Sequence, residues 1–467
     1  MLTKLKQVLV SATFWSVITI SFFSFLARGL GFVRQSLTYI KLESFQSDLL
    51  VSGNKVPDFL AMFLIMGTIF SSVLPVASRQ KNDKDISQYL NLVIFATSLI
   101  IGFLSLLIVI FTRPILEIFT SSSLWEEAIK QDYLEEYILA TRIMCLIPIV
   151  SALQSILGVF LNLKKKFLVY SLAGVIANLG SILGLYLSDN IFLNKLLGNE
   201  NNTQSIVIVS ISMVCGWMIS NLVFLIQALI SGFSFPDFKY IFNNWELFKT
   251  DLIQTWSLFL PRIFLIDGYY GASLMMNPIA ANTGQITAFD IGNSISAAFY
   301  ILIIALTTVT FPDLSKTLNN VENSQDFWPK FRKYVFITFV LSLFVTFLAL
   351  ILSPLIMYLF RLIGKGQGNE DYVSYIAQIS AFSLIFRSIR DIFSQYFFVL
   401  ERKWQPVILS TIGLVVEFLI INILYRLNFD TGYGASIALI FYNLVWVIVA
   451  FWMIKQDRNK INKRLDK

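Results

Sequence analysis

The sequence predicts an all-α membrane protein whose twelve transmembrane helices form two six-helix lobes related by a pseudo-twofold axis. Three observations predict this fold class. Hydrophobic residues make up 56% of the 467 residues and only 14% are charged, which is more apolar surface than a water-soluble domain can bury. Apolar runs long enough to cross a bilayer recur along the chain. Landmark residues of the first half return in the same order in the second half.

The apolar runs define the helices one by one. A helix that crosses the ~30 Å hydrocarbon core needs about 20 residues. Because the backbone groups of a segment in lipid must be paired within that segment, each run is predicted to be a helix. The twelve runs cover residues 9–38, 57–76, 90–112, 137–161, 167–187, 205–231, 250–274, 287–311, 335–360, 373–399, 406–425 and 435–454.

Lysine and arginine residues indicate how these helices are oriented. With a cytoplasmic N-terminus, the inner segments carry 22 of the 36 Lys and Arg residues, the outer loops carry eight, and six lie inside spans. Positive residues favour the cytoplasmic side of a membrane. We therefore expect both termini in the cytoplasm. The net charge of +7 then reports topology, and no nucleic-acid partner is expected.

The two halves share three landmarks at similar spacing. Pro75 leads to Pro114 over 39 residues, and Pro312 leads to Pro354 over 42. A basic turn follows 50 residues after Pro114 (LKKKF) and 48 after Pro354 (LERKW). These spacings favour a duplicated six-helix unit, although polytopic proteins in general place Pro and Lys near helix ends. Parallel copies imply an axis along the membrane normal and a transport site between the lobes.

This repeat sets the expected domain boundaries. The N-terminal lobe is expected at residues 1–231 and a cytoplasmic linker at 232–249. The C-terminal lobe is expected at 250–454 and a basic cytoplasmic tail at 455–467.

Composition excludes several classes of site. Histidine is absent, so His-based triads, His metal sites and imidazole proton relays are excluded. Cys145 and Cys215 lie in apolar runs and are expected to be core residues. No nucleotide-binding or zinc-binding pattern is present. We expect no catalytic residue, no metal site and no cofactor, which leaves a sodium or proton gradient open as the energy source.

Charged side chains inside the spans are candidate functional residues, because burying a charge in lipid is costly. Arg28 and Arg34 lie in the stretch ARGLGFVRQ, with Gly29 and Gly31 between them. On a straight helix the two side chains point about 120° apart. A bend at the glycines would turn both toward one cavity. Alternatively, the arginines extend to the interface and reach water there.

The tenth predicted span carries a second charged stripe. Arg387 and Asp391 lie one helical turn apart. Opposite charges at this spacing can pair, so we predict a structural ion pair that holds this helix to its neighbours.

Two further carboxylates lie in apolar spans of the second half, Asp267 and Glu417. Two carboxylates in helices of one lobe could share a cation or a proton. Alternatively, they pair with Arg262 or Arg390. The residues alone leave these two interpretations equally open.

The N-terminal motifs resemble those of a known family. ARGLGFVRQ, then Asp48, then NKVPDFLAMFLIMGTIFSSVLPVASRQ is similar to the start of the MurJ/MviN family of lipid II flippases. The family pattern runs SR-x-LGF-x-R-D, an Asp, K/R-x-PN and EGAFSQAFVP. The stretches GVFLNLKKKFLVYSLAGVIANL and FPDLSKTL also resemble family counterparts. This family is a branch of the MOP exporter superfamily, so the resemblance implies a MOP- or MATE-like fold with a cavity that opens alternately to each side.

The resemblance also implies a substrate site. Arg28, Arg34, Asp48 and Lys55 fall on charged family positions that line the cavity. The arginines would bind the pyrophosphate of a lipid-linked sugar, because guanidinium is permanently charged and binds phosphate through two hydrogen bonds. Arg262 is a candidate replacement for an arginine that the family carries on its eighth helix.

The chain also departs from the family pattern. Gln35 replaces an aspartate, Ala61 and Met62 stand where an arginine is expected, and Met66 replaces a glutamate. Some family members hold a sodium ion between the seventh and eleventh helices. By that resemblance, Asp267 is a candidate cation ligand with Glu417 as its partner.

The expected function is a flippase, which is a transporter and not an enzyme. It would move an undecaprenyl-pyrophosphate glycan, with lipid II as the first choice, across the bacterial cytoplasmic membrane. The main alternative is a Wzx-type flippase for O-antigen or capsule units. A cation-coupled drug exporter, a membrane glycosyltransferase and a scaffold without transport remain further alternatives. The expected partners are the lipid-linked sugar and the bilayer, and the protein is expected to be a monomer.

Overall fold

A computed structural model gives the fold. It describes residues 12–64, 68–80, 82–164, 166–188, 206–263, 265, 267–280, 284–300, 303, 306, 310, 314, 327–363, 370–400, 402 and 404–465. Every regular element in these ranges is a helix. The chain forms two compact units: the first comprises Met1–Phe119 and Leu124–Ile263, and the second comprises Thr120–Ser123 and Phe264–Lys467.

The first unit contains the helices of the N-terminal half. They are α2 (Ala12–Lys41), α3 (Ser44–Leu64), α4 (Thr68–Ala77), α5 (Asp83–Ile110), α6 (Thr112–Phe119), all but the first residues of α7 (Ser122–Lys130), α8 (Leu134–Met144), α9 (Leu146–Leu163), α10 (Phe167–Leu187), α12 (Ile206–Ile230), α13 (Phe238–Asn243) and α14 (Trp245–Ile263).

The second unit contains the helices of the C-terminal half. They are α15 (Gly268–Met276), the 3₁₀ turn η1 (Asn277–Ile279), α16 (Gln285–Phe299), α18 (Phe327–Ile363), α19 (Glu370–Val399), α20 (Gln405–Arg426) and α21 (Thr431–Leu465).

Each of the twelve predicted spans contains helix. Within the described ranges, six segments are long and apolar enough by themselves to cross a membrane: Asp83–Ile110, Leu134–Leu163, Ile206–Ile230, Phe327–Leu359, Gln405–Arg426 and Thr431–Asp457. The predicted all-α membrane fold is confirmed. The second span differs from its prediction in starting earlier, since α3 already begins at Ser44. Asp48 and Lys55 therefore lie inside a helix instead of before one.

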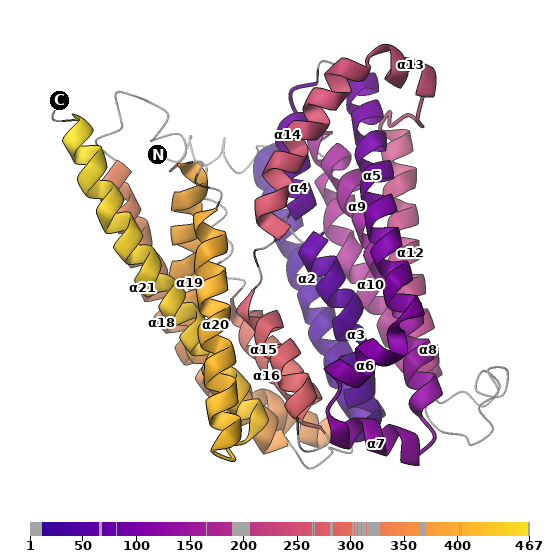
Figure 1. Ribbon diagram of the computed structural model, residues 1–467, viewed down its shortest axis with the longest axis vertical. Coiled ribbons are helices and arrows are strands. Elements are labelled where there is room, and N and C mark those ends of the chain that lie inside the picture. Colours follow the sequence, from indigo (N-terminus) through magenta and orange to yellow (C-terminus); the bar gives the residue numbers. More distant parts are fainter. Residues whose placement is uncertain are drawn as a thin grey trace. The chain divides into compact units, whose positions relative to one another are not determined.

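The two units pack their helices in the same order. In the first unit, α10 packs against α2 and α12, and α9 packs against α5 and α12. In the second unit, α20 packs against α15 and α21, and α19 packs against α18 and α21 (Figure 1). In both, the fifth span contacts the first and sixth, and the fourth contacts the third and sixth. The shared contact order supports the duplication predicted from the proline landmarks.

The proline landmarks differ in local structure between the two halves of the chain. Pro114 lies at the start of α6, which follows the end of α5. Pro354 lies inside the continuous helix α18. Pro75 lies in α4, and Pro312 lies outside the described residues. The equivalent proline therefore breaks the helix in one copy only.

Close helix packing in the first unit depends on glycines. A Cβ atom on Gly180 of α10 would lie 2.5 Å from Cα of Gly216 of α12. Gly184, one turn further along α10, has no room for a Cβ against Ser212 of α12. Small residues at such spacing let two membrane helices approach at backbone distance.

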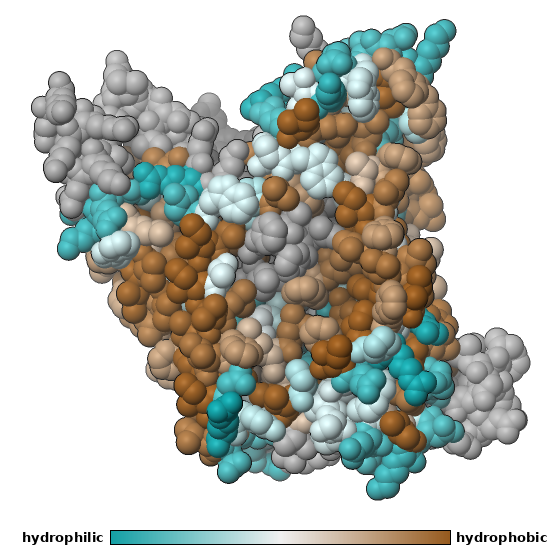
Figure 2. Space-filling model, in the orientation of Figure 1, coloured by the Kyte–Doolittle hydropathy of each residue, from teal (hydrophilic) through white to brown (hydrophobic). Residues whose placement is uncertain are grey.

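Large apolar side chains on the outer helices face away from the protein. On α20, a stripe of exposed side chains repeats at helical spacing: Ile408, Ile412, Val415, Phe418, Leu419 and Ile423. Figure 2 shows hydrophobic side chains over the middle of the second unit's helices and hydrophilic side chains at their ends. An exposed apolar surface of this extent is stable in a lipid environment and not in water.

The seventh predicted span is broken. Pro261 lies in the last turn of α14, and α15 begins only at Gly268. Asp267 caps α15, because its side chain accepts a hydrogen bond from the backbone N–H of Tyr269 at 3.1 Å. α14 packs against α4 in the first unit, so the compact units divide after Ile263, whereas the sequence suggested a linker at 232–249.

That expected linker is tied to the first unit by hydrogen bonds. The amide of Gln88 donates to Ser234 Oγ at 3.1 Å and to the carbonyl of Phe235 at 3.0 Å, and its carbonyl oxygen accepts from the N–H of Asp237 at 2.7 Å. Asp237 also pairs with Lys84 at 3.1 Å. The segment before α13 therefore folds onto the start of α5.

Candidate functional site

The first unit buries two of the predicted site residues on α3. Asp48 is 1% exposed and Lys55 is 5% exposed. They lie seven residues apart, which places them on one face of the helix about two turns apart. A buried aspartate and lysine on one face are not lipid-facing residues, because each charge requires polar surroundings.

The motif on α2 contacts α10. The amide of Asn178 donates to the carbonyl of Ala27 at 2.9 Å. A Cβ atom on Gly31 would lie 3.5 Å from the same amide, whereas one on Gly29 would meet nothing within 4 Å. α2 is continuous through both glycines. The helix is therefore not interrupted at either glycine.

The structure describes the side chain of one of the two arginines in the motif. Arg34 is half-buried on α2. The backbone of Arg28 is helical, as is that of Arg262 on α14, but both side chains lie outside the described part of the structure. Their expected position in a substrate cavity stays a prediction.

The second unit contains a half-buried charge cluster centred on Asp267. Its Oδ2 lies 3.1 Å from a guanidinium nitrogen of Arg390 and 3.4 Å from one of Arg387. The side chains are 25%, 11% and 24% exposed, respectively. One carboxylate at the broken helix therefore holds two arginines of α19.

Aromatic side chains and a second carboxylate complete this cluster. Arg390 also pairs with Asp391 at 3.5 Å, and the hydroxyl of Tyr300 donates to the other oxygen of Asp391. The guanidinium of Arg387 lies 4.8 Å from the ring centre of Tyr300, close enough for a cation–π contact. The predicted pair of Arg387 with Asp391 is wrong in its partner, because Arg387 points to Asp267 on the neighbouring element.

Glu417 of α20 lies beside this cluster. It is 0% exposed, and among the residues that the structure describes neither of its carboxyl oxygens has a hydrogen-bond partner. Its Oε2 would lie 2.6 Å from a Cβ on Gly271 of α15. Asp267 and Glu417 are therefore on packed elements, but Asp267 is bound by arginines. This pairing of Asp267 with Arg390 is one of the two interpretations that the sequence left open.

Sequence reasoning missed the tyrosines of this region. Tyr300 and Tyr442 lie against the arginines, with Arg390 5.8 Å from the ring centre of Tyr442. Tyr269 donates to Asp290 and stacks on Phe289 at 5.9 Å. A tyrosine in an apolar span gives no signal by itself. Its alignment with an arginine on another helix depends on the tertiary fold.

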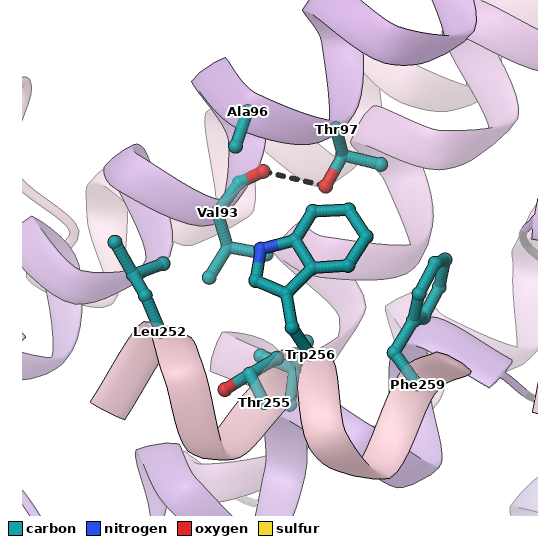
Figure 3. A pocket seen from close by; sticks show the side chains of 8 residues that line it. Val93, Ala96, Thr97, Leu252, Thr255, Trp256 and Phe259 are labelled. Carbon is teal, nitrogen blue, oxygen red and sulfur yellow. Dashed lines mark hydrogen bonds between the residues drawn. The ribbon is translucent and has the colours of Figure 1, made fainter. Parts of the chain in front are cut away.

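The first unit also has a shallow apolar pocket. It lies between α4, α5 and α14 and is lined by Val73, Val93, Ala96, Thr97, Leu252, Thr255, Trp256 and Phe259 (Figure 3). The hydroxyl of Thr97 donates to the carbonyl of Val93 on its own helix. The hydroxyl of Thr255 likewise donates to the carbonyl of Asp251, so both threonine hydroxyls of the lining are used within the protein and the lining is mainly apolar.

Comparisons with known proteins identify the fold and the family. The structure is similar to "Lipid II flippase MurJ, inward closed conformation", with TM-score 0.71 and 20% identity over 94% of this chain and 87% of that one. It is also similar to an inward-facing multidrug resistance MATE family transporter of the MOP superfamily, with TM-score 0.70 and 13% identity over 93% and 96%. A third similar structure is a MOP superfamily transporter from Pyrococcus furiosus, with TM-score 0.64 and 15% identity over 95% of both chains.

No curated protein matches the sequence. The family model described as "Lipid II flippase MurJ" matches residues 43–465, which is most of the chain. The chain therefore belongs to the MurJ lipid II flippase family.

Proposed function

We propose that this protein is a flippase that moves an undecaprenyl-pyrophosphate glycan, most directly lipid II, across the bacterial cytoplasmic membrane by alternating access. The family match over residues 43–465 carries this proposal. The same match favours lipid II over the O-antigen or capsule units of a Wzx-type flippase. Solved transporters of the same fold support transport as the class of activity. Both termini are proposed to lie in the cytoplasm, from the distribution of Lys and Arg.

The substrate's pyrophosphate is proposed to bind the arginines of the first unit. Arg28 and Arg34 would hold it, with Lys55 as a further cation and Arg262 as a contributor from α14. Asp48 would orient these side chains and limit the excess positive charge of the empty site. The burial of Asp48 and Lys55 on one face of α3 supports this assignment, because such charges are retained in a membrane protein for a function or a partner.

A sodium or proton gradient is the proposed energy source. Asp267 and Glu417 were candidates for a shared cation. In this conformation Arg387 and Arg390 already neutralise Asp267, so a sodium ion could bind there only by displacing two guanidiniums. Such a displacement would require new side-chain rotamers for both arginines.

The test is ligand binding to purified protein in nanodiscs, with lipid II and an undecaprenyl-pyrophosphate oligosaccharide as competing ligands. Losing one charge-assisted hydrogen bond costs about 1.5–3 kcal/mol, so Arg28→Ala should weaken lipid II binding about ten- to a hundredfold. Arg28→Lys should restore only part of the affinity, since the bidentate contact is lost.

Arg113→Ala is the matched control, because Arg113 is exposed on α6 and should leave affinity unchanged. Unchanged affinity in folded Arg28→Ala would contradict the proposed pyrophosphate contact. Tighter binding of the oligosaccharide than of lipid II would move the assignment to the Wzx class.

A further inference from the structure

The apolar pocket of the first unit has a buried floor and a half-buried rim (Figure 3). The floor consists of the buried residues Val73, Val93, Thr97, Thr255 and Phe259. Ala96 of α5 and Leu252 and Trp256 of α14 are half-buried and form the rim. The pocket is therefore open between α5 and α14.

The rim is continuous with the surface that faces lipid. Phe95, next to Ala96 on α5, is 68% exposed, and Ile253, next to Leu252 on α14, is 62% exposed. Side chains of this kind contact the hydrocarbon chains of a bilayer. A lipid chain that lies along α5 and α14 can therefore enter the pocket without crossing polar surface.

A lysine lies at the headgroup end of the pocket. Leu252, Trp256 and Phe259 follow at spacings of four and three residues, which places them on one side of α14. Lys249 lies one turn before Leu252 on the same side. Its pair with Glu246 is 3.8 Å long, with side chains 50% and 85% exposed. Such a solvated pair contributes little, so the ammonium can exchange this partner for a lipid phosphate.

The depth of the pocket matches the dimensions of a phospholipid. A rise of 1.5 Å per residue places Leu252 about 4.5 Å and Trp256 about 10 Å beyond Lys249 along the helix. The headgroup region of a bilayer is about 5–7 Å thick on each side of the hydrocarbon core. With Lys249 at the level of the phosphates, the rim of the pocket therefore lies at the start of the acyl chains.

The segment before α14 adds positive charge at this end of the unit. The ring of Tyr240 on α13 lies 6.4 Å from that of Phe248, the residue before Lys249. The ammonium of Lys84 lies 4.2 Å from the centre of the Tyr240 ring, and Lys239 is exposed on α13. Lysines at a membrane surface attract anionic lipids, so the charge favours an anionic headgroup over a zwitterionic one.

We propose that the pocket between α4, α5 and α14 is a phospholipid site, which binds one acyl chain of an anionic phospholipid with its phosphate at Lys249. The bound chain fills the space between α5 and α14 and adds apolar contacts to both helices. The site requires only that these helices lie in a bilayer. It does not depend on the proposed flippase function.

Photo-crosslinking of the full-length protein in phosphatidylcholine nanodiscs tests this site. The probes are phosphatidylglycerol and phosphatidylcholine, each with a diazirine on one acyl chain, and mass spectrometry assigns the modified residues. We expect phosphatidylglycerol to label Leu252 and Trp256 about fivefold more than phosphatidylcholine does, the factor for one lysine at an anionic surface. Both probes should label the exposed stripe of α20 equally. Equal labelling of the pocket by the two probes would overturn the proposal.

Two variants test the two ends of the lipid separately. Lys249→Gln should remove the preference for phosphatidylglycerol. Lys130→Gln should keep it, because α7 lies at the opposite end of the first unit from α13 (Figure 1). Ala96→Phe should fill the rim and prevent pocket labelling by both probes, whereas Leu99→Phe, on the exposed face of α5, should not.

A preference that survives Lys249→Gln would contradict the phosphate contact. Pocket labelling that survives in folded Ala96→Phe would contradict the acyl-chain site. Unlabelled phosphatidylglycerol should compete with the probe. Competition by undecaprenyl phosphate alone would assign the pocket to an isoprenoid carrier and overturn the phospholipid assignment.

Discussion

Asp267 is the residue whose removal should disturb the second unit most. Its carboxylate is the ion-pair partner of Arg387 at 3.4 Å and one of two partners of Arg390. Asp267→Asn removes the charge but keeps a side chain that caps helices well, so the contact with the N–H of Tyr269 survives. The substitution therefore isolates the ionic contribution.

The expected loss follows from burial. Breaking a buried ion pair by removing one partner costs about 3–5 kcal/mol. Arg390 keeps Asp391 at 3.5 Å, and the side chains of Asp267 and Arg387 are 25% and 24% exposed. These contacts place Asp267→Asn at the lower end of the range, about 3 kcal/mol. Asp267→Ala should lose about 1 kcal/mol more, because it also removes the helix cap.

Equilibrium unfolding in mixed detergent micelles, followed by far-UV circular dichroism, measures these losses. Adding Arg387→Gln to Asp267→Asn should cost less than the sum of the two single changes, because they share one contact. Glu246→Gln is the control, since its pair with Lys249 is 3.8 Å long with side chains 85% and 50% exposed, and should leave stability unchanged. A loss in Asp267→Asn no larger than that of the control would refute the reasoning.

Three more predictions follow from contacts elsewhere in the molecule. Gly180→Ala should lower the free energy of unfolding, because its Cβ would lie 2.5 Å from Gly216. A Cβ atom at Gly102 would meet open space, so Gly102→Ala should raise the free energy of unfolding by about 0.5–1 kcal/mol. Equal effects of the two substitutions in denaturant unfolding would contradict the packing of Gly180 against Gly216. A photoactivated carbene probe dissolved in the bilayer, which needs no thiolate, should modify the exposed side chain of Cys215 in the span Ile206–Ile230 and spare buried Cys145. Mass spectrometry would read the modification, and modification of both cysteines would contradict the burial of Cys145. The pKa of Asp237 lies below its usual range because the N–H of Tyr240 and the Lys84 ammonium stabilise its carboxylate. The contribution of the Asp237 carboxylate to stability is therefore present above the unfolded pKa of ~3.9 and is lost as pH falls through the acidic range. Hydrogen-exchange protection of the Tyr240 amide should fall with acid in the wild type and stay level in Asp237→Asn. Protection that stays level in the wild type would contradict the contact.

Hydropathy alone predicted the helical architecture, because the length of a span is set by the bilayer and not by tertiary contacts. Hydropathy did not predict the helix break before Asp267, since the apolar run continues through residues 250–266. Pro261 and a capping aspartate were the local signals for that break. The division of the units after Ile263 follows from packing of α14 on α4, which hydropathy does not encode.

The residues of the candidate site could also be predicted from the sequence, but their partners could not. Arg387, Arg390, Asp267 and Glu417 could be selected from sequence because charges in apolar spans are rare. Their partners could not be selected, since the spacing of Arg387 and Asp391 indicated a local pair, whereas the fold supplied Asp267 from another element. That no described residue donates a hydrogen bond to Glu417 is likewise a property of the folded unit.

Translocation of lipid II is the measurement that tests the central claim most directly. The protein would be expressed in a bacterium depleted of its own lipid II flippase, and lipid II in the outer leaflet would be quantified with a membrane-impermeant modifying enzyme. We expect the wild type to restore outer-leaflet lipid II, Arg113→Ala to match it, and Arg28→Ala to restore much less at equal protein levels. Outer-leaflet lipid II that stays at the depleted level, with the wild type correctly inserted in the membrane, would contradict the account.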